Sequence, residues 1–454
     1  MILKKHIPLK AKDLAILGLV TLPAISIAHP KAEPVKQHVT VSQPKVGGVA
    51  SFNYYYDDTG GNHVSNARKY GDWRFYDFKL HLTGDISALN YHVEYAWFRG
   101  MLNNLVSTND PSTYNQFLET HVGYKFSNGV VGQVGNTKVP FGNPETLGFW
   151  HNINFWAGFG DNYQTGLKMM YKDSPWDFEV QLGKNSLVNP NSAESYAPKL
   201  TTGIYVPESP ENAVIGGMNV ASTYYAKNNE DSLQLAARVV HTHHFHENTK
   251  VAVGLSGRIG NTYNTLSTKR ENQWAAALHA NGYVDRWLIQ LQYLPYRYSP
   301  KYPGADYGVG SNIVHNTMQL GKDGVLYTIP TKANIYAAGV GYKIPVSWGK
   351  IEEVTVFEEY STLSGKDTKK NTKMNTIGFK INVGPLFLIA EAITAKNMVG
   401  IGQGLLPNGA LNIFNIGGDG NASYVNNAGA LATTYDDSTN HWKTKFNINI
   451  AAKF

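Results

Sequence analysis

Apolar and polar residues alternate with a period of two along most of this chain. In residues 89–97 the odd-numbered positions are apolar and the even-numbered ones mostly polar, and residues 442–454 show the same pattern in the opposite phase. Because successive side chains of a strand point to opposite faces, this alternation predicts strands with one apolar and one polar face. Only residues 13–28 resemble a helix of any length.

The alternating stretches predict sixteen strands joined by turns and loops. Their expected ranges are 48–57, 72–83, 88–99, 115–127, 130–141, 164–173, 175–185, 231–243, 249–260, 271–281, 285–297, 332–344, 350–362, 373–384, 385–397 and 441–454. A further candidate, 213–226, is assigned to the long loop after the seventh strand, because a bacterial membrane barrel has an even number of strands.

Such strands fit a soluble sandwich or propeller, or a membrane barrel with lipid outside and water inside. Short connections such as 127–129 alternate with long ones such as 142–163, and no repeat of propeller-blade length occurs. Tryptophans lie at strand ends, as interfacial belts require: Trp97, Trp176, Trp274, Trp287 and Trp442. The sequence therefore predicts an all-β transmembrane antiparallel barrel with its apolar faces, which include Tyr76 and Leu118, toward lipid. A sixteen-stranded lumen is too wide for side chains to fill, so a long loop is expected to fold inward.

The N-terminus predicts a signal peptide over residues 1–28. Four lysines precede an apolar run of 15 residues, Leu14–Ala28, and the small Ser26 and Ala28 suit cleavage after Ala28. The run is too short for a membrane helix of about 20 residues. We expect residues 29–47 to form a flexible periplasmic extension and residues 48–454 to form the barrel, in a bacterial outer membrane.

Composition agrees with a barrel and excludes several other classes of protein. Charged residues make up 16% of the chain, against roughly a quarter in soluble proteins. The chain has no cysteine, which excludes disulfide scaffolds, thiolate metal sites and cysteine catalysis. Removing the signal peptide takes away four lysines and Asp13, which lowers the net charge from +6 to +3. Nucleic-acid binding then has little support, because no basic block remains.

Alternation also assigns charged residues to the lumen. The expected lumen-facing bases are Lys79, Lys125, Lys168, Lys172, Arg238, Arg258, Lys343, Lys380, Lys443 and Lys445. The expected lumen-facing acids are Asp77, Glu94, Glu119, Asp177, Glu179 and Glu391. The faces of Lys138 and of strand 350–362 stay ambiguous, so Glu353, Glu358 and Glu359 could reduce the basic excess. A mildly anion-selective channel and a weakly selective pore with mixed wall charges are equally open.

Residues 132–142, GQVGNTKVPFG, resemble the strand-to-loop motif of the phosphate-selective porin O and P family. Residues 166–171 and 176–184 are similar to the hairpin that follows it there. The terminal Phe454 resembles the signal read by the barrel assembly machinery. The resemblance implies a homotrimer of sixteen-stranded porins, with the third loop in the lumen and basic residues along an anion path.

Four residues match the family motif position by position: Lys138, Pro140, Phe141 and Gly142. Lys138 joins the expected anion path, and Pro140, Phe141 and Gly142 are expected in the constriction loop with Trp150, His151 and Trp156. Loop 142–163 contains no Lys or Arg, which departs from a phosphate filter that needs clustered cations. Strand residues would have to supply them.

Other chemistry has weaker support. Four histidines in residues 241–246, HTHHFH, resemble a metal-binding tract, but a solvated turn is the favoured interpretation. No GxSxG, HExxH or P-loop motif occurs, so an outer-membrane enzyme is a minor alternative, as is an adhesin using the long loops. No cofactor or metal is expected. The expected partners are small hydrophilic solutes, inorganic anions, outer-membrane lipid and the assembly machinery.

Overall fold

The computed structural model contains one closed antiparallel barrel. It describes residues 40–57, 71–98, 114–186, 229–264, 270–299, 317–322, 325–366, 371–398, 414–415, 421–425, 431–435 and 442–454. The barrel strands are β1 (Lys45–Asp57), β2 (Asp72–Ile86), β3 (Leu89–Phe98), β4 (Tyr114–Lys125), β5 (Val130–Lys138), β6 (Tyr163–Asp173), β7 (Trp176–Ser186), β8 (Asn229–His246), β9 (Thr249–Asn264), β10 (Arg270–Val284), β11 (Trp287–Arg297), β14 (Lys332–Trp348), β15 (Ile351–Gly365), β16 (Thr372–Val383), β17 (Leu386–Lys396) and β21 (Lys443–Lys453). One short helix, α2 (Ile153–Trp156), interrupts the connection between β5 and β6.

Two small sheets complete the secondary structure of the described residues. The first comprises β12 (Thr317–Lys322), β13 (Val325–Pro330) and β18 (Phe414–Asn415). The second pairs β19 (Asn421–Val425) with β20 (Leu431–Tyr435). Both belong to connections between barrel strands that the sequence assigned to long loops.

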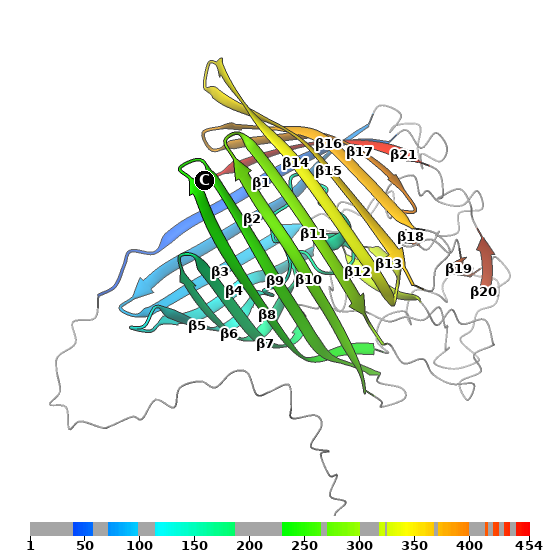
Figure 1. Cartoon of the computed structure of the whole chain (residues 1–454), viewed down its shortest axis with the longest axis horizontal. Coiled ribbons are helices and arrows are strands. Elements are labelled where there is room, and N and C mark those ends of the chain that lie inside the picture. The colour runs from blue at the N-terminus through cyan, green and yellow to red at the C-terminus, as the bar shows by residue number, and fades with distance from the viewer. Residues whose placement is uncertain are drawn as a thin grey trace, which may run out of the picture. The chain divides into compact units, whose positions relative to one another are not determined.

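The barrel closes where the first and last strands meet. β1 pairs with β21 from Val49↔Lys453 to Asp57↔Lys445, which brings the blue and red ends of the sheet together in Figure 1. The expected sixteen-stranded barrel is therefore confirmed. Segment 213–226 and the signal peptide lie outside the described residues, and the domain boundaries stay predictions.

The two faces of the sheet differ in polarity. Outward positions are exposed and apolar, for example Leu255 at 57% and Leu278 at 54% exposure. Inward positions include buried amides such as Gln181, Gln234 and Gln273. This is the reverse of a soluble sandwich, and closure leaves no unpaired sheet edge, as hydrocarbon surroundings require. The chain is thus a barrel of the bacterial outer membrane. Among the described residues, no helix combines the length and apolar character of a membrane span.

The expected alternation loses its phase at two β-bulges. The register between β1 and β2 shifts by one residue, so Tyr76 packs inward against Phe149 while Phe75 faces outward beside Phe52. A second shift, between β3 and β4, turns Leu118 into a buried cluster. The sequence-based outward assignments of Tyr76 and Leu118 were wrong, because a bulge inserts one residue and inverts the faces beyond it.

Candidate functional site

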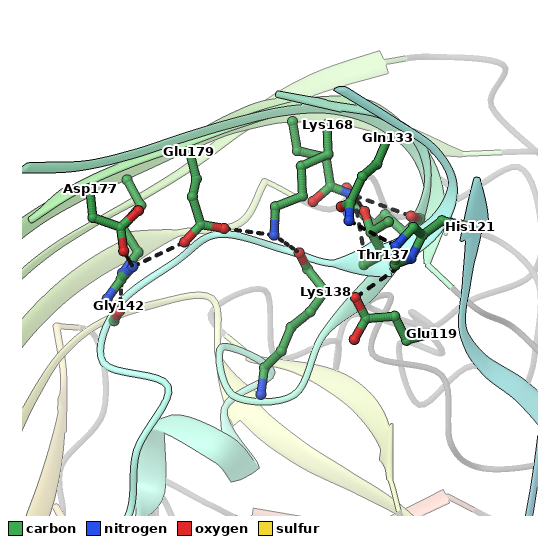
Figure 2. Close-up of polar contacts among 12 residues, drawn as sticks. Glu119, His121, Gln133, Thr137, Lys138, Gly142, Lys168, Asp177 and Glu179 are labelled. Atoms are coloured by element: carbon green, nitrogen blue, oxygen red, sulfur yellow. Dashed lines mark hydrogen bonds and ion pairs between the residues drawn. The ribbon is translucent and has the colours of Figure 1, made fainter. Parts of the chain in front are cut away.

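Residues 139–162, here called the lumen loop, leave β5 and fold into the barrel. Gly142 adopts a φ of 63°, a conformation that favours glycine, at the point where the chain turns inward. Its N–H donates to Ser256 Oγ at 3.1 Å, and its carbonyl accepts from Arg238 Nε at 3.2 Å (Figure 2). Arg238 on β8 and Ser256 on β9 therefore fix the start of the loop. The expected inward fold of the loop is confirmed.

Two buried wall carboxylates, Glu359 and Glu391, hold the middle of the loop; we call them the carboxylate clamp. Glu359 on β15 accepts from the main-chain N–H groups of residues 147 and 148 at 3.3 and 3.2 Å and from the Asn152 amide at 2.7 Å. Glu391 on β17 accepts from the N–H groups of residues 149 and 150, both at 2.9 Å. The clamp satisfies four consecutive loop amides that would otherwise be unpaired.

Sequence reasoning missed the clamp. Alternation placed Glu391 in the lumen and left the face of Glu359 open, but it carries no information about which loop atoms a carboxylate meets. The register of β15 now places Glu353 and Glu359 inward and Glu358 outward, so two of the three uncertain acids do reduce the basic excess.

Aromatic packing completes the attachment of the loop. Trp150 and Trp156 are fully buried with ring centroids 5.6 Å apart, and Lys445 Nζ lies 4.5 Å from the centroid of the Trp150 ring. His151 has a φ of 60° and stacks on Phe155 at 4.0 Å. The indole rings thus anchor the loop to the β21 wall. Pro140 and Phe141 are buried where the loop begins.

A row of alternating charges crosses three strands beside the loop (Figure 2). Lys168 Nζ on β6 lies 2.6 Å from Glu179 on β7, and Arg238 on β8 lies 3.0 Å from the same carboxylate. Lys168 also donates to the carbonyl of Lys138 at 3.2 Å. We call Lys168, Glu179 and Arg238 the charged row. In this row two bases expected along the anion path, Lys168 and Arg238, share the carboxylate of Glu179. Arg238 also holds the lumen loop at Gly142, and Lys168 holds the end of β5 from which the loop starts.

Most other expected lumen bases also have partners. Ion pairs join Lys79 to Asp77 at 3.1 Å, Lys125 to Asp85 at 3.1 Å, Lys343 to Glu353 at 3.5 Å, and Lys138 to Asp161. Arg258 donates to Tyr298 Oη at 2.7 Å and lies over Phe159, while Lys380 lies over Phe357. Lys172 and Lys443 occupy lumen-facing strand positions towards opposite ends of the barrel. The described bases do not form one cationic cluster, and their role in conduction stays a prediction.

Three histidines form a stack on the lumen face of β2, β3 and β4. The ring centroids of His81 and His92 are 6.0 Å apart, and those of His92 and His121 are 5.7 Å apart. Glu94 and Glu119 lie 3.7 Å from His92 and His121, respectively. Sequence reasoning did not single out this row, because only the strand register aligns the three positions. Within the described ranges, no three His, Asp or Glu side chains are arranged to hold a metal ion.

The sequence favoured a solvated turn for the histidine tract 241–246, and this prediction was wrong. The tract forms the last residues of β8, and the tight turn comes directly after it. Its side chains therefore alternate between the two faces, and His241 packs against Trp176 with ring centroids 4.5 Å apart. Strand propensity and pairing with β9 prevail over the polarity of the tract.

No protein-family model and no curated protein matches the chain. OmpF of Salmonella typhi, in complex with daunomycin, aligns over 90% of this chain and 97% of its own, at 9% identity and a TM-score of 0.50. The channel DcaP of Acinetobacter baumannii aligns over 91% and 97%, at 10% identity and 0.49. An anion-selective porin from Comamonas acidovorans aligns over 91% and 99%, at 12% identity and 0.48.

The match to OmpF extends over nearly the whole of both chains, and at this identity it concerns the fold alone. Membership of the phosphate-selective porin O and P family stays a prediction, since no family model supports it. Barrel, inward loop and comparison agree on one result: the chain has the fold of an outer-membrane porin.

Proposed function

We propose that the chain is a porin, a water-filled channel through which small hydrophilic solutes diffuse passively, with a mild preference for anions such as phosphate. The observation that carries the proposal is the lumen itself. It is wide enough to need a folded-in loop, and its wall is lined with amides and charges of both signs. No energy source other than the solute gradient is required.

The support for an anion preference lies in the bases around the loop. Arg238, Arg258 and Lys445 all approach the lumen loop, whose own residues include no Lys or Arg. Rings and carboxylates hold these bases in place, so any selectivity comes from wall charge rather than a dedicated binding site. The preference is accordingly small.

A second candidate is a weakly selective or sugar-permeable pore, and the ion pairs favour it. Glu179 faces both Lys168 and Arg238, and Glu353 faces Lys343, so much of the basic charge is neutralised locally. Planar-bilayer reversal potentials across a KCl gradient separate the two candidates. A chloride-favouring sign supports the first, a potential near zero supports the second, and a cation-favouring sign contradicts the anion preference. Absence of conductance would contradict a porin.

The charged row gives a matched test by substitution. Arg238→Gln removes a wall cation and should shift the reversal potential toward cations, whereas Glu179→Gln should shift it toward anions. Lys184, at an outward position on the same strand as Glu179, supplies the control, since Lys184→Gln should leave the potential unchanged. Shifts of the same sign for the two lumen variants would contradict a role for the row in selectivity.

We also propose that the chain is not an enzyme. Its two most buried lumen carboxylates, Glu359 and Glu391, already accept hydrogen bonds from loop amides, which supports a structural use of both groups. A lipase assay on the purified barrel with phospholipid vesicles tests this. Hydrolysis that survives removal of contaminants would contradict it.

A further inference from the structure

A cavity of about 450 Å³ lies between the lumen loop and the barrel wall. Loop residues 144–147 form one side of it, and residues of β10, β11 and β16 form the other. The side chains that determine its chemistry are Glu145, Leu147, Asn281, Tyr283, Leu288, Gln290 and Lys380. Sites for small molecules have volumes of roughly 300–1,000 Å³, so the cavity is large enough to hold a solute.

Lys380 brings a positive charge to this cavity. Its Nζ lies over the Phe357 ring, 5.4 Å from the ring centroid, and among the described residues no carboxylate lies within ion-pair distance of it. The carboxylates whose charges act on it are Glu359, Glu391 and Glu145. Glu359 and Glu391 are buried and already accept hydrogen bonds from loop amides. The ammonium of Lys380 can therefore pair with a solute.

Glu145 brings a negative charge to the same cavity from the loop side. Its side chain is exposed, and the Tyr283 hydroxyl donates to its Oε2 at 2.8 Å. In the described part of the chain, its other oxygen, Oε1, has no hydrogen-bond donor. The amides of Asn143 and Asn281 bond to each other at 2.8 and 3.1 Å and hold the loop just before Glu145. The position of this carboxylate is thus set before a solute arrives.

The cavity also presents apolar surface. Leu147 and Leu288 line it, and both belong to the cluster around Phe357, the ring beneath Lys380. Apolar walls with a few fixed polar groups are the usual composition of a small-molecule site. The cavity therefore offers one ammonium, one carboxylate and an aliphatic face to whatever enters it.

We propose that this cavity binds a small zwitterionic solute, an α-amino acid with an aliphatic side chain. The solute's carboxylate pairs with Lys380 and its ammonium pairs with Glu145, while its side chain contacts the two leucines. A solute with only a carboxylate would approach Glu145 without compensation, and one with only an ammonium would approach Lys380 in the same way. Because the two charges of the cavity oppose each other, the site adds little to the ion selectivity that the wall charge sets.

Saturation-transfer NMR on the whole barrel in mild detergent tests binding with L-leucine, glycine, isocaproate and isoamylamine. Isocaproate is leucine without its amino group, and isoamylamine is leucine without its carboxyl group. We expect saturable transfer to leucine and binding about tenfold weaker for each single-charge analogue, which loses one hydrogen-bonded charge. Glycine should also bind more weakly, because it buries no side chain. Absence of transfer to leucine, or equal binding of either analogue, would overturn the proposal.

Substitutions test the two charged residues separately. Glu145→Gln and Lys380→Gln should each weaken leucine binding about tenfold. Glu145→Gln should also bring isocaproate to the level of leucine, and Lys380→Gln should do the same for isoamylamine, which a merely structural role would not produce. The controls are Glu353→Gln, whose carboxylate pairs with Lys343 at 3.5 Å, and Lys373→Gln, at an outward position on β16. Leucine binding that neither cavity variant weakens, or that the controls weaken equally, would contradict the assignment.

As a step in permeation, the inference rests on the proposed porin function, whereas binding itself is measured without transport. Uptake of leucine into liposomes that contain the barrel should approach a maximum as its concentration rises, while uptake of glucose should rise linearly. A barrel that binds leucine but admits neither solute would contradict the porin proposal and leave the binding site in place. A barrel that admits both solutes linearly and shows no transfer to leucine would overturn the site and leave the porin proposal in place.

Discussion

Replacing both Glu359 and Glu391 by alanine is expected to raise the single-channel conductance several-fold. The double variant removes the acceptors of four consecutive loop amides and of the Asn152 side chain. Hydrogen bonds to charged groups contribute about 1.5–3 kcal/mol each, so the middle of the lumen loop loses most of its polar attachment. The loop should then move away from its present position and widen the passage. Planar-bilayer recording measures the change.

Two further variants make this experiment specific. Glu353→Ala changes a lumen-facing carboxylate on the same strand that pairs with Lys343 and should leave the conductance nearly unchanged. The double Gln variant keeps an acceptor oxygen at both positions and should lie between alanine and the unmodified chain. If the double alanine variant conducts like the unmodified chain, the clamp does not hold the constriction.

Phe454→Ala is expected to reduce the amount of assembled barrel in the outer membrane to a small fraction. The terminal ring stacks on Phe78 at 5.9 Å, and the main chain of Phe454 exchanges hydrogen bonds with Gly48 at 2.9 and 3.1 Å. The ring contact contributes only about 0.5–1.5 kcal/mol, too little to unfold a sixteen-stranded barrel. A large loss of assembled protein would therefore indicate failed recognition by the assembly machinery.

The measurement is heat-modifiable gel mobility of membrane fractions, which separates folded from unfolded barrel. Phe446→Ala is the matched control, because Phe446 is an outward aromatic side chain on β21, the strand that Phe454 directly follows, and is 45% exposed. Equal losses for the two variants would contradict a special role for the terminal residue.

The fold was predictable because lipid and water impose opposite demands on the two faces of every strand. All sixteen barrel strands overlap the expected ranges, although β8 and β14 extend several residues further than the alternation suggested. The errors at Tyr76 and Leu118 come from bulges. A bulge depends on the pairing of two strands and leaves no mark in either strand alone.

The site was less predictable, for a related reason. Alternation places Lys168 and Arg238 in the lumen, but only the register between β6, β7 and β8 brings both to Glu179. Likewise, nothing local in residues 147–150 identifies their acceptors, which lie more than 200 positions later in the chain. Counting charges therefore overstated the free basic charge of the wall.

The attachment points of the lumen loop also have a mechanical consequence. The loop is bonded to Arg238 and Ser256 at one end and to Glu359 and Glu391 in its middle, so it braces widely separated sectors of the wall. A cylinder with such an internal brace resists flattening better than an empty one. Lateral pressure from the membrane and the width of the passage are thereby coupled, because any deformation of the barrel's cross-section is transmitted to the loop.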